Sequence, residues 1–392
     1  MLKSLRKPSW LFSSQMSNMD RGLYIHIPFC KSKCLYCDFC SYSGMSGLMT
    51  DYSKALAKEI ARTDGSVINT IFMGGGTPTH LSLEGWGIIG EAIVQLNIRG
   101  DAEFSVEANP GTFDTEKLKF LKGIGVNRLS IGLQAVQNRH LKNLGRIHSY
   151  EDFLSGYGAA RQIGFSNINV DLMFGLPGQT MEDWKESLHK IAELDPEHIS
   201  CYSLIIEEGT EFYRRYEEGS LQLTDEETER DMYRYTLEFL EQKGYLQYEI
   251  SNFSKPGKEC RHNLIYWNLE EYIGCGAGAH SFVDGVRLSN PQGIAEYIDS
   301  MQSKGEGAEA REVHRNTTQD TMSEFMFMGL RKISGVDTAG FRRRFGEDIY
   351  KVYGDVIRKF EGRGLIVAED GRIRLTGIGI ELSNSVMCEF IL

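Results

Sequence analysis

Residues 23–39 read LYIHIPFCKSKCLYCDF and place three cysteines directly behind an apolar, β-prone run. Cys30, Cys34 and Cys37 form the pattern Cys-x3-Cys-x2-Cys. Iron–sulfur clusters prefer soft thiolate ligands, and three thiolates leave one iron of a four-iron cluster without a protein ligand. We therefore predict that these cysteines hold a [4Fe–4S] cluster whose fourth iron is open for chemistry.

A zinc site is the alternative interpretation of the same cysteines. Tetrahedral zinc needs four ligands, usually in two separated pairs. Cys40 is the only nearby candidate for the fourth ligand. The spacing alone does not decide between the two metals.

The composition indicates a soluble protein with a large buried core. The chain has 392 residues, 41% of them hydrophobic, which we expect to form one large domain and one smaller domain. Its 8 cysteines cluster instead of pairing through loops, as in proteins of a reducing compartment such as the cytoplasm. The net charge of −11 argues against a nucleic-acid partner. No apolar run reaches the roughly 18 residues that a transmembrane helix needs.

The first twenty residues have a different character. Residues 1–20, MLKSLRKPSWLFSSQMSNMD, are basic and rich in serine, with no acidic residue before Asp20. Such a segment is typical of a transit peptide, which would direct the protein to an organelle, or of a start codon assigned too early. In both cases we expect a disordered extension outside the fold.

From residue 22 to about 205, short β-prone runs alternate with helical stretches. This alternation predicts parallel strands joined by crossover helices, in an α/β fold that forms a partial (β/α)6 barrel. The strands are predicted at residues 23–27, 69–73, 103–108, 126–131, 167–173 and 198–204. The helices are predicted near residues 50–63, 81–96, 114–122, 136–143, 151–163 and 181–193. Because reactive groups in such barrels come from the carboxyl ends of the strands, we expect the site at that end.

After the extension, we divide the chain into three parts. Residues 21–250 are assigned to the barrel and its extension, which includes a capped helix over 224–244. Residues 251–310 are interpreted as a linker region rich in aromatic residues and glycine. Residues 311–392 predict three helices followed by a hairpin, an order that resembles a small winged-helix module. Because its charges are mixed, we expect this module to pack or to act as a lid rather than to bind DNA.

Motifs around the cysteines resemble the radical S-adenosylmethionine (SAM) superfamily. Tyr24-x-His26 precedes the first cysteine, and the glycine-rich run Gly74-Gly75-Gly76-Thr77-Pro78 follows the next predicted strand. The resemblance implies a [4Fe–4S] cluster whose open iron binds SAM, and it decides against zinc. Because a fourth thiolate would close that iron, Cys40 is interpreted as a neighbouring thiol outside the ligand set.

Three later motifs narrow the resemblance to the oxygen-independent coproporphyrinogen III oxidase group. They are RLSIGLQ at 128–134, LGRIH at 144–148 and NVDLMFGLPGQT at 169–180. In that group, the positions that match Tyr24, Gly75 and Glu107 contact the cluster-bound SAM. The positions around a second SAM correspond here to Tyr36, Gly76, Thr77, Gln134, Arg146 and Asp171.

One branch of this group consists of haem chaperones, and several features resemble that branch. Cys37-Asp38-Phe39 lacks the second cysteine that the dehydrogenase branch has. The motif HNLIYW at 262–267 and the glycine-rich stretch YIGCGAGAHS at 272–281 also match the chaperone branch. The resemblance implies transfer of haem to apo-proteins, membrane respiratory proteins among them. The alternative is a coproporphyrinogen III dehydrogenase that uses radical SAM chemistry, and the residues do not decide whether SAM is turned over.

A haem chaperone needs an axial ligand, which imidazole or thiolate supplies. His262 is the first candidate because Tyr266 and Trp267 provide flat aromatic surface beside it. Three weaker candidates are Cys260, Cys275 and His280. The expected cofactors are therefore the [4Fe–4S] cluster, SAM and haem.

Overall fold

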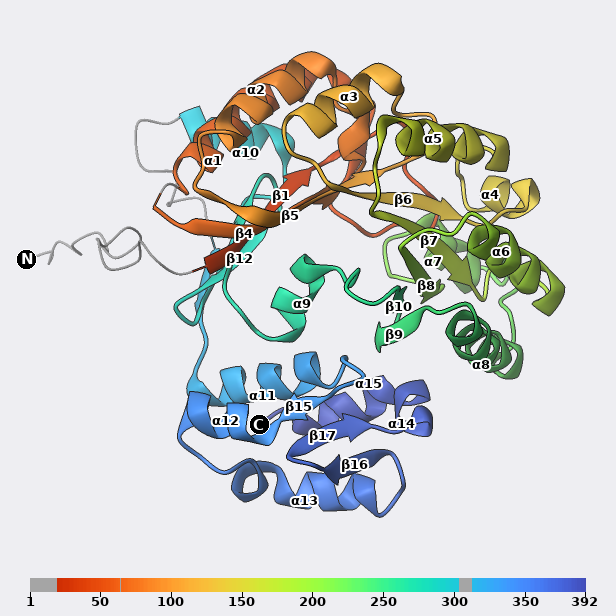
Figure 1. Cartoon of the computed structure of the whole chain (residues 1–392), viewed down its shortest axis with the longest axis vertical. Coiled ribbons are helices and arrows are strands. Elements are labelled where there is room, and N and C mark those ends of the chain that lie inside the picture. The colour runs from red at the N-terminus through yellow and green to blue at the C-terminus, as the bar shows by residue number, and fades with distance from the viewer. Residues whose placement is uncertain (1–19, 64, 303–311) are drawn as a thin grey trace, which may run out of the picture.

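The computed structural model describes residues 20–63, 65–302 and 312–392, so residues 1–19 of the extension predicted at 1–20 lie outside the described residues, whereas Asp20 begins the first strand. All six predicted strands are present and form the parallel centre of one large sheet (Figure 1). They are β1 (Asp20–Ile27), β4 (Val67–Gly75), β5 (Ile98–Ala108), β6 (Arg128–Gln134), β7 (Ile168–Phe174) and β8 (His198–Ser203). The predicted α/β fold with a partial barrel is confirmed.

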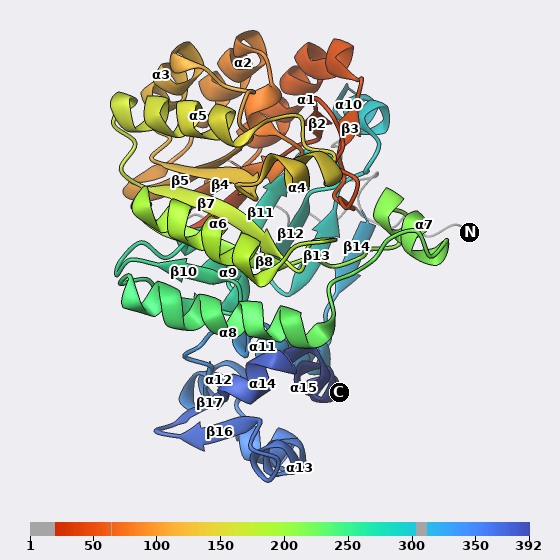
Figure 2. The ribbon, with the colours of Figure 1, turned by 90° about the vertical axis from the view of Figure 1, so that its right-hand side faces the viewer.

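The predicted helices connect these strands and cover one face of the sheet (Figures 1 and 2). They are α1 (Met49–Ala61), α2 (Leu83–Ile93), α3 (Thr115–Gly123), α4 (Asn138–Asn143), α5 (Tyr150–Ile163) and α6 (Met181–Glu193). Ser149 and Thr180 begin α5 and α6 with capping boxes, in which Asp152 and Asp183 bond back to the cap residue. These local signals explain why the helix starts were predictable.

The two faces of the sheet differ in chemistry. Along β5, Phe104 and Val106 join the main apolar core under the helices, whereas Glu103 and Ser105 lie on the other face. Buried polar side chains of neighbouring strands gather on this inner face: Thr70, Glu103, Ser105, Arg128, Ser130, Asn169, His198 and Ser200. The barrel interior is therefore polar, and the helix α9 (Arg261–Trp267) packs into it (Figure 1).

The sheet continues beyond both ends of the predicted barrel. At one end β11 (Tyr272–Cys275) pairs parallel with β1, and β12 (His280–Val283), β13 (Val286–Ser289) and β14 (Glu312–Arg315) follow antiparallel. At the other end β10 (Asn252–Ser254) and β9 (Leu246–Glu249) pair antiparallel beside β8. Residues 251–310, interpreted from the sequence as a linker region, therefore supply strands of the main sheet. These strands have only three or four residues each, too few to show a clear period of two.

Three further helices complete the barrel unit. They are α7 (Glu211–Glu217), α8 (Glu226–Gln242) and α10 (Ile294–Gln302). The predicted helix at 224–244 corresponds to α8, which Asp225 caps by accepting a hydrogen bond from the backbone of Thr228.

The carboxyl-terminal unit has its own apolar core and the predicted order of helices and hairpin. Its elements include α11 (Thr318–Gly329), α12 (Thr338–Phe345), α13 (Ile349–Glu361), β16 (Ile366–Glu369) and β17 (Arg372–Leu375). The short strand β15 (Val336–Asp337), which pairs with β17, was not predicted. Two short helices, α14 (Gly377–Glu381) and α15 (Ser383–Met387), follow the hairpin.

Contacts at separate points hold this unit against the barrel. Arg287 on β13 pairs with Glu324 on α11 at 2.7 Å, and Arg234 on α8 pairs with Glu381 at 3.0 Å. The Arg331 guanidinium lies 4.4 Å from the centre of the Trp267 ring, on α9. No helix in the described part of the chain has both the length and the apolar character needed to cross a bilayer.

Candidate functional site at the carboxyl end of the barrel

The three predicted cluster ligands lie on one loop just after β1. Two short strands, β2 (Phe29–Cys30) and β3 (Tyr42–Ser43), pair with each other and frame this loop. Cys30, Cys34 and Cys37 are partly exposed, and none of them forms a disulfide. Burial raises the pKa of the Cys30 and Cys37 thiols, so their thiolate forms need a nearby positive charge. Three partly exposed thiols on one loop fit a cationic iron cluster.

Hydrogen bonds hold the loop in a defined shape. The Lys33 ammonium donates to the backbone oxygens of Phe39 and Ser41, at 3.0 Å and 3.3 Å. The Leu35 N–H donates to the Leu144 oxygen at 3.0 Å, which ties the loop to the segment between α4 and α5. These hydrogen bonds define the path of the loop and fix it against the segment between α4 and α5.

Cys40 faces a different part of the molecule. Its Sγ lies 3.6 Å from the backbone oxygen of Gln292, and a Cβ added at Gly278 would come within 2.9 Å of the same sulfur. A zinc ion would hold each sulfur about 2.3 Å from one centre. Within residues 20–63, 65–302 and 312–392, no three Cys, His, Asp or Glu side chains converge on one point, the three loop cysteines included, so the side-chain positions do not decide between zinc and a cluster.

The glycine run at the end of β4 packs so closely against neighbouring segments that a side chain would not fit. Gly75 has φ +108°, and a Cβ there would overlap the ring of His26. At Gly76 a Cβ would meet the backbone oxygens of Ile27 and Phe29 at 2.9 Å. Glycine therefore lets the end of β4 pack closely against β1 and the cysteine loop, and the binding of SAM at this strand end stays a prediction.

His26 connects the first strand to the cysteine loop and was not among the predicted site residues. Its Nε2 lies 2.7 Å from the Cys40 backbone oxygen, which only accepts, so Nε2 carries the proton. Its Nδ1 then accepts from the Tyr24 hydroxyl at 2.9 Å. Burial lowers the pKa of His26, which favours this neutral form. The motif Tyr24-x-His26 was the signal in the sequence.

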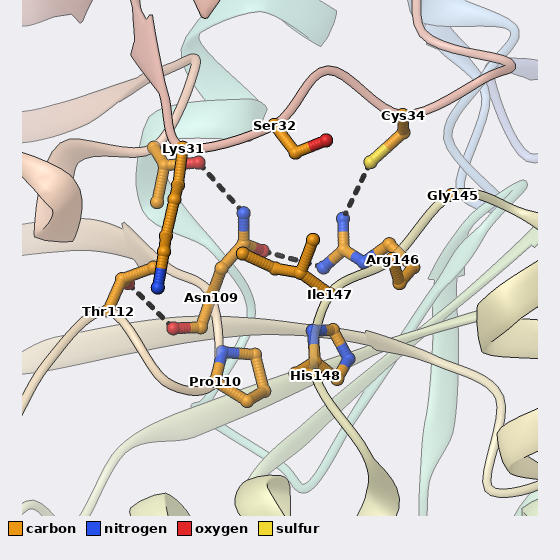
Figure 3. Close-up of a pocket in the computed structure, with 11 residues that line it drawn as sticks. Lys31, Ser32, Cys34, Asn109, Pro110, Thr112, Gly145, Arg146, Ile147 and His148 are labelled. Atoms are coloured by element: carbon orange, nitrogen blue, oxygen red, sulfur yellow. Dashed lines mark hydrogen bonds between the residues drawn. The ribbon is translucent and has the colours of Figure 1, made fainter. Parts of the chain in front are cut away.

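Arg146 joins the cysteine loop to the strand ends (Figure 3). It donates to Cys34 Sγ at 3.4 Å and to Asn109 Oδ1 at 2.7 Å. Asn109 in turn donates to Thr77 Oγ1 at 2.8 Å, and Thr77 Oγ1 lies 3.6 Å from Cys30 Sγ. The predicted residues Thr77 and Arg146 are thus linked through Asn109, which was not predicted. Its only signal was its place between Glu107 and Pro110 at a strand end.

Glu107 and Asp171 bring two carboxyl groups into the barrel interior. Glu107 accepts the Gly75 N–H at 3.1 Å, and burial, with the Asp171 charge next, raises the pKa of Glu107 to about 7. Asp171 accepts from Asn169 at 2.7 Å and from Ser130 at 3.2 Å, and burial raises its pKa as well. Glu107 therefore titrates near neutral pH and is suited to bind a cationic amino group.

Gln134 and Tyr36 complete the set predicted around SAM. Gln134 ends β6 in the left-handed backbone region, with φ +75°. Tyr36 packs against Phe212 in a small apolar cluster, with ring centres 6.4 Å apart. All nine predicted SAM residues lie in the carboxyl halves of β1 and β4 to β7 or in the loops that follow them.

His262, the first haem-ligand candidate, lies farther inside the barrel. Its side chain is fully buried, and its Nδ1 and Nε2 lie 2.8 Å from the hydroxyls of Thr70 and Tyr266. Burial, with the Arg128 charge next, lowers the pKa of His262 to about 3. Both ring nitrogens are thus engaged, so haem ligation by His262 requires these hydrogen bonds to break.

The weaker haem candidates are also spread over different environments. Cys260 is fully buried and donates to Glu103 Oε1 at 3.6 Å, and Cys275 is fully buried in β11. His280 is exposed at the start of β12. The structure does not gather these groups into one site.

Comparisons with known proteins match this architecture. The sequence matches the family model of the radical SAM superfamily over residues 24–191 and that of the HemN C-terminal domain over residues 316–382. It is 42% identical over 377 residues to a protein of Bacillus subtilis named heme chaperone HemW, covering 95% of this chain and 99% of the relative. A mitochondrial protein of Danio rerio, named radical S-adenosyl methionine domain-containing protein 1, is 31% identical over 390 residues, covering 95% of this chain and 87% of the relative.

Among solved structures, coproporphyrinogen III oxidase (HemN) from Escherichia coli superposes with a TM-score of 0.82. The match covers 95% of this chain and 90% of that chain at 22% sequence identity. At this level of identity the two proteins share their fold, from the barrel through the carboxyl-terminal unit.

Proposed function

The chain belongs to the HemW family of haem chaperones within the radical SAM superfamily, and we propose that it binds haem, a [4Fe–4S] cluster and SAM and transfers haem to acceptor apo-proteins. The observation that carries this proposal is the loop with three partly exposed thiols beside a glycine-lined strand end. When bound, the cluster offers an open iron to SAM. Acceptors in this proposal include respiratory proteins that contain haem.

Cys30, Cys34 and Cys37 are the proposed cluster ligands. Their support is their position on one partly exposed loop, outside disulfides, together with the Arg146 guanidinium 3.4 Å from Cys34 Sγ. A cluster and a guanidinium both favour the thiolate forms that metal binding needs. Cys40, held against Gln292, stays outside this ligand set.

Tyr24, Gly75 and Glu107 are the proposed contacts of the SAM that sits on the cluster. Glu107 uses one oxygen on the Gly75 N–H and has further lone pairs for an amino group. The rest of the proposed SAM environment consists of Tyr36, Gly76, Thr77, Gln134, Arg146 and Asp171. These residues bind and orient, and none of them is assigned to bond cleavage.

A haem-transfer assay tests the proposal. The protein, reconstituted with cluster under anaerobic conditions, is loaded with haem and mixed with an apo-cytochrome of the b type. We expect the Soret band to move to that of the holo-cytochrome, faster than from free haem or haem-loaded albumin. No haem binding by the wild type, or transfer no faster than from albumin, would contradict a chaperone function.

A second candidate function is oxygen-independent oxidation of coproporphyrinogen III. The residues Gln134, Arg146 and Asp171 and the fold shared with HemN favour it, whereas Phe39 stands two positions after Cys37, where the dehydrogenase branch has a cysteine. Anaerobic incubation with SAM, a reductant and coproporphyrinogen III separates the two functions. Formation of protoporphyrinogen would replace the chaperone proposal, and we expect none.

A further inference from the structure

The His26 side chain is held in one place by its neighbours. It is buried, and its ring packs on Gly75, where an added Cβ would overlap it. Its backbone oxygen accepts a hydrogen bond from the Tyr52 hydroxyl at 2.8 Å, which anchors the residue to α1. On the far side, a Cβ added at Gly276 would come within 2.5 Å of that oxygen. The position of the ring is therefore defined on two sides by backbone.

The two hydrogen bonds of this ring set the direction of the Tyr24 hydroxyl. Nε2 of His26 carries the proton, because the Cys40 backbone oxygen 2.7 Å away only accepts. Nδ1 therefore presents a lone pair, and the Tyr24 O–H donates to it at 2.9 Å. A hydroxyl has one proton and two lone pairs. Because its proton points at His26, the Tyr24 oxygen offers only lone pairs to any other group.

Glu107 supplies a second acceptor in the same part of the barrel. Its strand β5 is separated from β1 by β4 alone, and burial, with the Glu107 charge next, raises the pKa of Tyr24. One Glu107 oxygen accepts the Gly75 N–H at 3.1 Å, and the other makes no hydrogen bond within the described part of the chain. Tyr24 and Glu107 are both partly accessible, whereas His26 lies buried behind them. A ligand here meets the tyrosine and the carboxylate, not the histidine.

Two acceptors without a donor favour a ligand group that only donates. An ammonium group has three N–H donors and no acceptor, and its positive charge strengthens its hydrogen bond to an ionised carboxylate. A ligand carboxylate would face lone pairs and the like charge of Glu107 instead. SAM carries one ammonium group, on its α-carbon, close to its carboxylate. The arrangement of Tyr24 and Glu107 therefore distinguishes between the two ends of the SAM amino-acid moiety.

We propose that His26 is a positioning residue that keeps the Tyr24 hydroxyl an acceptor and thereby gives the site its preference for the α-ammonium group of SAM. His26 acts through Tyr24 and does not touch the ligand. Its bond to the Cys40 oxygen ties this preference to the cysteine loop, because the loop supplies the acceptor that fixes the tautomer. The inference rests on the proposed binding of SAM and names the ligand group that Tyr24 and Glu107 recognise.

Two ligands and three variants test this role. SAM and its desamino analogue, in which hydrogen replaces the α-amino group, are titrated calorimetrically into cluster-loaded protein, and the ratio of their dissociation constants is the ammonium preference. We expect Tyr24→Phe and His26→Leu each to lower this preference about 10-fold, the effect of one hydrogen bond to a charged group. The double variant should lose no more than Tyr24→Phe alone, because His26 acts through Tyr24. Other contacts of the amino group are common to all variants and cancel in the comparison.

Two controls separate this role from a general effect on the strand end. His26→Gln should keep most of the preference, since one amide group both donates and accepts. Tyr52→Phe removes the hydrogen bond to the His26 backbone oxygen but leaves both ring bonds, so it should lower stability and keep the preference. Cluster absorbance is measured for each variant.

Nitrogen-15 NMR of histidine-labelled wild type locates the ring proton directly, with His26→Gln used for assignment. It decides the question if His26→Leu does not hold a cluster. We expect the proton on Nε2 with and without SAM, and a proton on Nδ1 would overturn the inference.

The outcomes also separate this inference from the proposed function. If His26→Leu weakened SAM and the analogue by the same factor, His26 would have a structural role only, and the inference would be overturned. A wild-type preference retained in Tyr24→Phe would overturn it too, because Tyr24 would then not contact the ammonium group. Both results leave SAM binding in place. Failure of the cluster-loaded wild type to bind SAM would instead remove SAM from the proposed function.

Discussion

The loop with Cys30, Cys34 and Cys37 and the helix α9 with His262 both present metal-binding residue types to the interior of one barrel. At the loop, three thiols are partly exposed and outside disulfides. On α9, His262 is fully buried between the hydroxyls of Thr70 and Tyr266. Residue type alone does not make a site, because a donor whose bonds are already made has little left for a ligand.

The largest effect is expected from removing a cluster ligand. Cys34→Ser should abolish the iron–sulfur absorbance of the reconstituted protein, because two thiolates do not hold a four-iron cluster in place. Cys40→Ser is the matched control and should keep that absorbance, since Cys40 faces Gln292. If Cys40→Ser lost the iron–sulfur absorbance while Cys34→Ser kept it, the ligand assignment would be overturned.

A change on α9 should act on stability instead. His262→Ala leaves the buried hydroxyls of Thr70 and Tyr266 without their partner and opens a cavity, so we expect the free energy of unfolding to fall by about 2–4 kcal/mol. Urea unfolding measures it, with the exposed His280→Ala as a control within about 0.5 kcal/mol of the wild type.

The Soret band of the folded His262→Ala variant sharpens the comparison. From the saturated hydrogen bonds of His262 we expect the band to match that of the wild type. A band that disappears in the folded variant would instead support the axial role predicted from the sequence.

A smaller effect is expected at the glycine strand end. Gly75→Ala places a Cβ on the His26 ring and strains a backbone at φ +108°, so we expect a loss of about 1–3 kcal/mol in stability. Because the strand end would move, SAM affinity should also fall. Gly111→Ala is the control, since φ is +76° there but nothing lies within 4 Å of the added Cβ. Equal SAM affinity in both variants would argue against a close approach of SAM at Gly75.

The smallest effect is a pH dependence. The pKa of Glu107 is raised to about 7 from 4.5, so folding favours its protonated form. The contribution of Glu107 to the free energy of unfolding therefore declines as pH rises from about 4.5 to 7. SAM affinity should rise over the upper part of this range, as the carboxylate that attracts an amino group forms. Isothermal titration from pH 6 to 8 should show this rise in the wild type and a flatter profile in Glu107→Gln. Parallel profiles would remove Glu107 from the SAM site.

The barrel was predictable from sequence because its signals are local. Strand positions followed from short β-prone runs such as 167–173, and the helix starts carry local signals in the caps Ser149 and Thr180. The cysteine loop was recognisable as a metal site from its spacing, and the neighbouring motifs then favoured a cluster over zinc. The carboxyl-end location of the site then followed from the geometry of parallel barrels.

Other features depend on contacts between distant segments and were not predictable. The pairing of β11 with β1 joins residues about 250 positions apart, and glycines at 274, 276 and 278 pointed to a loop. The saturation of His262 depends on Thr70, from another strand, and on the burial of α9. Asn109 acquires its role only because Thr77 and Arg146 meet there.

Hydrogen–deuterium exchange with and without SAM, on the cluster-loaded protein, tests most directly whether SAM binds at the cysteine loop while α9 is a structural plug. We predict that SAM slows exchange in residues 31–39 and 74–78 and leaves residues 261–267 unchanged. SAM-dependent changes confined to residues 260–268, with none around the cysteine loop, would contradict the account.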